Sequence, residues 1–345
     1  MFYFRADGNQ NIGMGHLMRS LSIALKMEDV DTAFICADEI SKSEVEKRGL
    51  RAYVTGMEPF STEEALRILD MAGEEDAILL DSYLFDNEYI NILKRKFIVI
   101  CMDDLAEKVF EADAVVNYNC YADEEEYEKL YMGMDDELPI FITGGSYIPL
   151  RDEFSNVEYT YGEEVKKILI TTGGADKDNY AERILRRLYE SKKSDSGVIY
   201  HVVCGAFSPH YGELLSYAEG NDRIVIHHDV QNMAELIASC DMAVSAGGST
   251  CYELCAIGIP FIVFAYVKNQ TRIEKTLGSC GAALDAGYVG DSSDAEVIDN
   301  VYALSEKMLS DSKFRIATGK TGHLKVDGQG ALRLSNRLIK VMEGI

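Results

Sequence analysis

The chain has 345 residues, more than a single hydrophobic core usually organises and enough for two. Its 58 acidic residues outnumber 34 basic ones, and the formal net charge of −24 excludes nucleic acid or an anionic membrane as the partner, since both require Lys and Arg to neutralise phosphates. The eight cysteines form no CxxC pair and no apolar run approaches the roughly 18 residues of a membrane span, so we expect a cytoplasmic protein without disulfides.

Short apolar runs alternate with helical patterns along the first half of the chain. Runs rich in Val, Ile and Leu predict strands at residues 2–5, 32–36, 51–55, 77–80, 97–102 and 114–117. Amphipathic patterns between them predict helices at residues 17–26, 42–47, 61–71 and 87–94. Strands that alternate with helices are typical of a parallel sheet covered on both faces.

The alternation stops between residues 118 and 163, where acidic and Tyr-rich stretches predict a linker near the end of the segment. It resumes with strands at 167–171, 197–203, 224–226, 242–245 and 261–265, and helices at 181–189, 233–240 and 251–257. The sequence therefore predicts two doubly wound α/β domains that face each other, over residues 1–155 and 165–345. Ligands of such sheets bind beyond the carboxyl ends of the strands, so we expect the active site in the cleft between the domains.

A glycine-rich turn, RADGNQNIGMGHLMR at residues 5–19, follows the first predicted strand and leads into a helix. Gly13 and Gly15 allow close approach of a ligand, and the helix N-terminus favours a phosphate. His16 on the first helical turn could then exchange a proton with the ligand. Neither the P-loop nor the dinucleotide fingerprint fits, because Met14 follows Gly13 and the spacing gives GMGHLM. The pattern also fits an ordinary strand–helix turn in which the histidine has no chemical role.

A second glycine turn, SAGGST at residues 245–250, leads into the helix predicted at 251–257. Gly248, Ser249 and Thr250 can bind a phosphate at the helix N-terminus. Glu253 has two interpretations: a capping-box partner of Thr250, or a carboxylate that accepts hydrogen bonds from a ribose diol.

Further polar positions follow other predicted strands. Gly173 and Gly174 form a third glycine turn, and Asn269 and Gln270 follow the strand at 261–265. Asp103-Asp104 also ends a strand, where a sugar contact and a structural role are both possible. The histidines show no metal-ligand spacing, so we expect neither a metal nor a cofactor.

These pieces together resemble the UDP-sugar hydrolase family of the pseudaminic acid pathway. The resemblance is carried, in order, by RADGNQNIGMGHLMRSLSIA at 5–24, DSY at 81–83, DD at 103–104, GGSYIPLRDEF at 144–154, TTGGAD at 171–176, SAGGSTCYELCAIGIP at 245–260, NQ at 269–270 and DGQGALR at 327–333. The second domain also resembles the donor-binding half of the peptidoglycan N-acetylglucosaminyltransferase, which has the two-domain GT-B architecture.

The resemblance implies metal-independent removal of UDP from UDP-2,4-diacetamido-2,4,6-trideoxy-β-L-altropyranose. It implies that His16 is the general base, that Asp7 lies beside the sugar, and that Glu253 holds the ribose. It also implies that Ser249 and Thr250 face the diphosphate, while Asn269 and Gln270 reach into the cleft.

One histidine can suffice because helix N-termini can stabilise a leaving diphosphate, and water attack opposite the UDP predicts inversion. Two residues depart from the family pattern: Ser20 stands where many relatives have Cys, and Gly8 stands where Ala or Ser is common. These two differences are also compatible with a different UDP-sugar as the substrate. A glycosyltransferase on the same scaffold and a non-catalytic nucleotide-sugar-binding protein are the alternatives, and the sequence leaves the oligomeric state open, with a monomer compatible.

Overall fold

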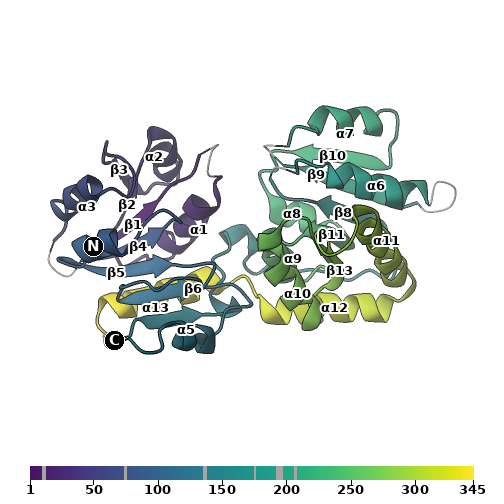
Figure 1. Ribbon diagram of the computed structural model, residues 1–345. Helices are drawn as coiled ribbons and strands as arrows, with labels where there is room; N and C mark the ends of the chain where they lie inside the picture. Colours follow the sequence, from purple (N-terminus) through teal and green to yellow (C-terminus); the bar gives the residue numbers. More distant parts are fainter. Residues whose placement is uncertain (10–12, 74–75, 135–137, 175, 192–196, 206–207) are drawn as a thin grey trace. The chain divides into compact units, whose positions relative to one another are not determined.

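The computed structural model describes residues 1–9, 13–73, 76–134, 138–174, 176–191, 197–205 and 208–345. The chain forms two compact units (Figure 1). Unit 1 comprises residues 1–151 and 329–345, and unit 2 comprises residues 152–328. Residues 10–12 of the first glycine turn and Ala175 of the third lie outside the described residues.

Unit 1 contains, among its described residues, a seven-stranded parallel sheet in the order β3-β2-β1-β4-β5-β6-β7. The strands are β1 (Phe2–Ala6), β2 (Thr32–Cys36), β3 (Arg51–Val54), β4 (Asp76–Asp81), β5 (Phe97–Met102), β6 (Ala114–Asn117) and β7 (Ile140–Thr143). The helices are α1 (Gly15–Ala24), α2 (Glu39–Glu46), α3 (Thr62–Leu69), α4 (Asn87–Leu93), α5 (Glu124–Leu130) and α13 (Gly330–Met342), with a 3-10 turn η1 (Gly145–Tyr147).

Alternate residues of the central strand β1 serve the two faces of this sheet. Tyr3 packs in a buried cluster that includes Ile68 of α3 and Ile90 of α4. Phe4 is fully buried on the opposite face, where its ring stacks on Phe34 at 5.0 Å. Both faces are thus apolar, as the runs of Val, Ile and Leu predict for a parallel sheet.

Most helices of unit 1 begin at a side chain that accepts a hydrogen bond from the first turn. Asp38, Ser61, Asp86 and Asp123 do so for α2, α3, α4 and α5. Helices α1 and α13 differ, because their N-cap residues Met14 and Gln329 make no such bond. The amides of their first turns therefore receive no cap from the N-cap side chain.

The last helix, α13, belongs to unit 1, whereas the sequence analysis assigned residues 165–345 to one second domain. Gly330 explains the close packing, since a Cβ there would lie 2.2 Å from the carbonyl oxygen of Ile148. Ser335 Oγ also donates to the carbonyl of Lys26 at the end of α1, at 3.3 Å. The helical pattern of this segment cannot reveal on which sheet it packs.

Unit 2 contains, within the part of the chain that the structure describes, a six-stranded parallel sheet in the order β10-β9-β8-β11-β12-β13. The strands are β8 (Lys167–Thr171), β9 (Ile199–Cys204), β10 (Ile224–His228), β11 (Met242–Ala246), β12 (Phe261–Ala265) and β13 (Leu284–Tyr288). The helices are α6 (Tyr180–Glu190), α7 (Tyr211–Ala218), α8 (Met233–Ala238), α9 (Thr250–Ile257), α10 (Thr271–Ser279), α11 (Asp294–Ser310) and α12 (Ser312–Lys325), with 3-10 turns η2 (Asp152–Phe154) and η3 (Lys268–Gln270).

The predicted doubly wound parallel sheets are confirmed in both units. Within residues 118–163, which we expected to break the alternation, the structure has α5 and β7. The short edge strand β7 was not predicted, because acidic and Tyr-rich stretches surround it. No described helix is long and apolar enough to cross a membrane.

Helix α12 packs closely on the end of α9, and glycine makes this contact possible. A Cβ on Gly319 would lie 2.3 Å from the carbonyl oxygen of Gly258, which ends α9 with a φ of 83°. Glycine is therefore required at both positions, for close approach at one and for positive φ at the other.

We predict that Gly319→Ala destabilises unit 2 by about 1–3 kcal/mol, because the added methyl group overpacks the α9–α12 contact. Gly212→Ala is the matched control, since a Cβ there has nothing within 4 Å and alanine favours the helix. Calorimetric melting should show a lower transition temperature for the first variant and an unchanged or higher one for the second. Equal melting of the two variants would contradict the prediction.

Candidate functional site

The first glycine turn lies where the strand order of unit 1 reverses. Strands β1 and β4 are neighbours, and Ala6 at the end of β1 is in register with Asp81 at the end of β4. In open α/β sheets, this reversal point is where ligands bind beyond the carboxyl ends of the strands. The topology therefore brings the first turn and Asp81 to one place.

The described part of this turn is closely packed. Gly13 has a φ of 79°, and its N–H donates to the carbonyl of Asn9 at 2.8 Å. A Cβ on Gly8 would lie 2.8 Å from Cβ of Leu17, so glycine fits the packing against α1. Gly15 is the first residue of α1, and its Cβ position is open. The turn thus presents the uncapped N-terminus of α1 at the reversal point.

His16 contacts a buried carboxylate. Its Nδ1 lies 2.7 Å from Oδ1 of Asp81, whose side chain is fully buried, while the His16 side chain is 17% exposed. An ionised carboxylate only accepts, so Nδ1 carries a proton, and in the neutral ring Nε2 then carries the lone pair. The ring of Tyr83 packs edge-on against the imidazole, with centroids 4.9 Å apart. His16 is therefore held in the tautomer that can accept a proton at Nε2.

Arg19 binds the same carboxylate from one helical turn further along α1. Its Nε lies 2.7 Å from Oδ2 of Asp81, and its Nη2 donates to Oδ1. Burial alone would raise the pKa of Asp81, but the charge and hydrogen bonds of Arg19 and the hydrogen bond from His16 outweigh it and lower this pKa to about 2. Asp81 is therefore ionised at any physiological pH.

The far side of Arg19 contacts a second carboxylate and a phenol. Nη1 lies 2.8 Å from Oδ1 and 2.9 Å from Oδ2 of Asp104, and 2.7 Å from the hydroxyl of Tyr118. Tyr83 donates its hydroxyl to Oδ2 of Asp104 at 2.7 Å. Burial and then the charge of Asp104 raise the pKa of Tyr83, so this phenol stays protonated. We call His16, Arg19, Asp81, Tyr83, Asp104 and Tyr118 the His16 cluster.

Asp7 directly follows β1, and its carboxylate binds partners other than His16. Its Oδ2 accepts from Nη1 of the buried Arg5 at 2.6 Å, and its Oδ1 accepts from the backbone N–H of Ala37 at 2.6 Å. Glu64 binds the other side of Arg5. Burial would lower the pKa of Arg5, but the two carboxylates outweigh it and raise the pKa. Among the described residues, the hydrogen bonds join His16 to Asp81 and not to Asp7.

The sequence analysis did not name most of the His16 cluster as site residues. Asp81, Tyr83 and Asp104 lie in the DSY and DD segments, which follow β4 and β5. The rule that ligands bind beyond strand ends, which drew attention to Asp103-Asp104, could also have identified Asp81 and Tyr83. Asp103, by contrast, has a structural role, because its carboxylate accepts from the backbone N–H groups of Leu105 and Ala106.

Two further glycine turns meet at the reversal point of the unit 2 sheet. β8 and β11 are neighbours there, so residues 172–174 and 247–250 follow adjacent strands. A Cβ on Gly205 would lie 2.3 Å from the carbonyl oxygen of Gly173 and 2.4 Å from that of Gly174. A Cβ on Gly247 would lie 2.7 Å from the carbonyl oxygen of Gln270. Backbone segments from several strand ends therefore approach each other closely at this edge.

Helix α9 begins in this second group of turns without a side-chain cap. Its N-cap is Ser249, whose side chain makes no cap hydrogen bond and whose residue is exposed. Because the helix begins at Thr250 with Ser249 as its N-cap, Thr250 lies inside the first turn and not at the cap position that a capping box with Glu253 needs. Gly248 has open space around its Cβ position. The start of α9 is thus suited to an anion, as is the start of α1.

Asn269 and Gln270 lie in η3, directly after β12. Asn269 is exposed, whereas Oε1 of Gln270 accepts from the backbone N–H of Tyr266 at 3.0 Å. Gln270 therefore shapes the loop in which Asn269 is presented. The hydroxyl of Tyr266 in turn donates to the carbonyl of Thr172 at 2.9 Å, which joins this loop to the turn after β8.

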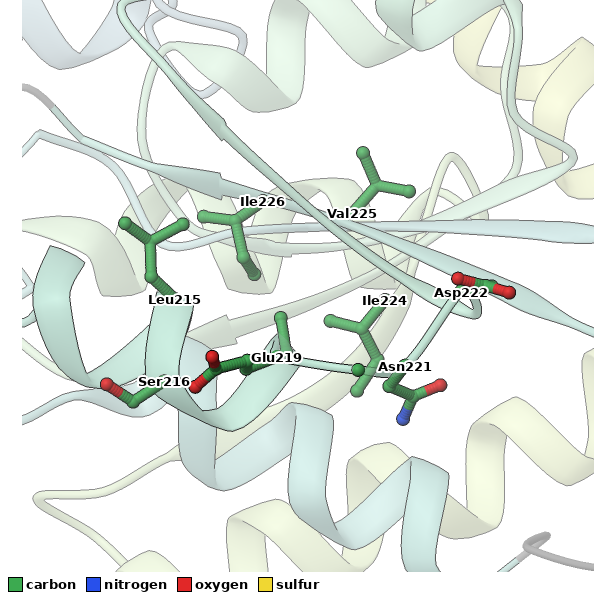
Figure 2. Close-up of a pocket in the computed structure, with 10 residues that line it drawn as sticks. Leu215, Ser216, Glu219, Asn221, Asp222, Ile224, Val225 and Ile226 are labelled. Carbon is green, nitrogen blue, oxygen red and sulfur yellow. The ribbon is translucent and has the colours of Figure 1, made fainter.

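A pocket of about 630 Å³ lies at another edge of unit 2, between α7 and the start of β10 (Figure 2). Its lining comes from residues 215–226 and contains none of the predicted site residues. The described residues also contain no group of three or more His, Cys, Asp or Glu that could hold a metal ion.

Comparisons with known proteins find a matching family model and relatives that cover most of the chain. Residues 167–285 match the model of the Glycosyltransferase family 28 C-terminal domain. The chain is 25% identical over 337 residues to the spore coat polysaccharide biosynthesis protein SpsG of Bacillus subtilis, covering 96% of this chain and 95% of the relative. It is 25% identical over 289 residues to the UDP-2,4-diacetamido-2,4,6-trideoxy-β-L-altropyranose hydrolase of Campylobacter jejuni, covering 83% of this chain and 98% of that one.

Solved structures show the same architecture. Acinetobacter baumannii MurG superposes with a TM-score of 0.66 at 14% identity, over 98% of this chain and 99% of that one. Anabaena Alr3699/HepE, in complex with UDP and glucose, superposes with a TM-score of 0.60 at 12% identity, over 100% of this chain and 99% of that one. The chain therefore has the fold of the GT-B glycosyltransferases, and its unit 2 contains a segment similar to the family 28 C-terminal domain.

Proposed function

We propose that the protein hydrolyses a UDP-linked diacetamido-trideoxy sugar of the pseudaminic acid pathway, releasing UDP and the free sugar with inversion. The observation that carries this proposal is the His16–Asp81 pair at the uncapped start of α1. The similarity to the Campylobacter hydrolase over 98% of that enzyme supports the choice of substrate. We further propose that this protein acts in the cytoplasm.

In the proposed reaction, His16 is the general base. Its Nε2 takes a proton from water, and the water oxygen forms a bond to the anomeric carbon. The bond from this carbon to the diphosphate oxygen breaks, and its electron pair leaves with UDP. Asp81 stabilises the imidazolium that forms. A single displacement inverts the anomeric configuration, and the leaving diphosphate needs no metal or acid when helix N-termini stabilise its charge.

Unit 2 is proposed to bind the UDP part of the substrate. The diphosphate would contact the start of α9 at Gly248, Ser249 and Thr250, and Glu253 would accept hydrogen bonds from the ribose hydroxyls. The backbone at Gly173 and Gly174 would approach the UDP closely, and Asn269 and Gln270 would add further polar contacts. In unit 1, Gly13 and Gly15 would let the sugar phosphate approach His16, while Asp7 would act through Arg5 on the shape of the turn.

A glycosyltransferase is the second candidate, favoured by the match of residues 167–285 to the Glycosyltransferase family 28 C-terminal domain. The same base would then deprotonate a sugar hydroxyl in place of water. The two candidates differ in one observable: a hydrolase releases UDP and free sugar without an acceptor, whereas a transferase needs one.

We predict that the protein, incubated without acceptor with a panel of UDP-sugars, releases UDP and the inverted free sugar from the diacetamido-trideoxy substrate, as followed by NMR. His16→Ala should lower turnover by about 10²–10⁴-fold because the general base is lost. Its UDP affinity, measured by calorimetry, should stay unchanged.

His323→Ala is the control for the loss of an imidazole, since Nδ1 of His323 only bonds the carbonyl of Ala256. Normal turnover by His16→Ala would refute the proposal. Tight binding of every UDP-sugar with no conversion by the wild type would instead indicate a binding protein.

We predict that Asp81→Asn lowers turnover by about 10²–10⁴-fold while the fold is kept. An amide can donate to Nδ1, which would place the proton of His16 on Nε2 and remove the base. Asp86→Asn is the matched control, because Asp86 caps α4 and asparagine caps equally well. Steady-state rates with the best panel substrate measure both variants, and equal rates would contradict the role of Asp81.

We predict that Glu253→Gln weakens UDP binding roughly tenfold or more, because a charged acceptor for the ribose hydroxyls is lost. Calorimetry with UDP and with 2′-deoxy-UDP separates this role from a structural one. The wild type should prefer UDP, and the preference should shrink in the variant. An unchanged preference with a lower melting temperature would show that Glu253 only supports its helix.

A further inference from the structure

Arg19 connects the whole His16 cluster, yet the proposed reaction assigns it no step. It follows His16 by three residues on α1, so both side chains project from one helix face. Its side chain is 12% exposed. A buried cation this close to a general base must affect the chemistry of that base.

The guanidinium is fixed at all three of its nitrogens. Nε and Nη2 bind the two oxygens of Asp81, and Nη1 binds Asp104 and Tyr118. The guanidinium carbon also lies 5.3 Å from the centre of the Tyr118 ring. Each nitrogen therefore has a protein acceptor, and this geometry holds Asp81 in place more than it offers a cation to a diphosphate.

Two opposite effects meet at the imidazole of His16. The Asp81 carboxylate favours the protonated ring, while Nη2 of Arg19, 3.1 Å from Nδ1, disfavours it. Nδ1 of His16 and Nη2 of Arg19 both donate to Oδ1 of Asp81, which explains why these two nitrogens lie close together. The ring of Tyr83, in the loop after β4, packs against the imidazole. Asp104 and Tyr118 are linked to the imidazole through their hydrogen bonds with Arg19.

We propose that Arg19 is a positioning residue that fixes the Asp81 carboxylate against Nδ1 of His16 and keeps the imidazole a weaker base than an unshared carboxylate would make it. The proposal rests on the proposed role of His16. Its consequence is that the neutral ring keeps its proton on Nδ1 and its lone pair on Nε2.

The test is an NMR titration of the His16 ring in the free protein, which needs no substrate. In Arg19→Gln the opposing cation is gone, so the pKa of His16 should rise by roughly one to two units. A base must be unprotonated to act, so the acid limb of the rate profile with the best panel substrate should move to higher pH by the same amount. An unchanged pKa of His16 in this variant would overturn the proposal.

Arg19→Lys separates charge from geometry. It keeps the cation but lacks the planar fork, so the pKa of His16 should stay near the wild-type value while kcat falls and KM changes little. Arg48→Gln is the matched control, because Arg48 contacts Glu44 and Met18 outside the cluster, and it should change neither quantity. If Arg19→Gln fails to fold by circular dichroism, Arg19→Lys decides, and a wild-type kcat would overturn the proposal.

The two proposals fail in different experiments. Normal turnover by His16→Ala removes His16 as the base and leaves the titration result intact. An unshifted titration in Arg19→Gln removes the role of Arg19 and leaves the loss of activity in His16→Ala intact.

Discussion

The candidate site depends on one buried carboxylate that three cationic or polar neighbours share. Asp81 ends the central strand β4, and it accepts hydrogen bonds from His16, Arg19 and Ser20 of α1. Burying an ion is costly unless its partners replace water, and here they do so well enough to lower its pKa to about 2. The same bonds fix α1 on the sheet and orient the imidazole, so the position of the helix and the chemistry of the histidine have a single cause.

The two units share one arrangement at the carboxyl ends of their strands. In each, the strand order reverses between the first and fourth strands of the sheet, and a glycine turn after the first strand lies beside a polar group from the fourth. The N-cap side chains of α1 and α9, which begin there, make no cap hydrogen bond, and the same holds for α6, α7, α10 and α13. Leaving amides without an internal acceptor reduces helix stability, and a bound anion compensates for this.

Much of the fold was predictable because its signals are local. The apolar runs of the central strands predicted two parallel sheets, and the glycine turns predicted the edges where we propose that the ligand binds. The edge strand β7 and the placement of α13 were not predictable, because they depend on contacts distant in sequence. The partner of His16 was missed for the same reason: Asp81 lies 65 residues away, and only the register of β1 with β4 brings it near. Asp7, next to the turn in sequence, pairs instead with Arg5.

The return of the chain to unit 1 affects the order in which the protein can fold during synthesis. The seven strands described in unit 1 leave the ribosome first, but α1 and η1, against which α13 packs, lack this partner until unit 2 has been made. Unit 2 is in effect an insertion within unit 1, and its entry and exit are held together, because Ser155 Oγ donates to the carbonyl of Gly328 at 2.9 Å. Segments with adjacent ends can fold without waiting for their host domain. The nucleotide-binding half proposed here can therefore be complete on the ribosome before the half that carries His16.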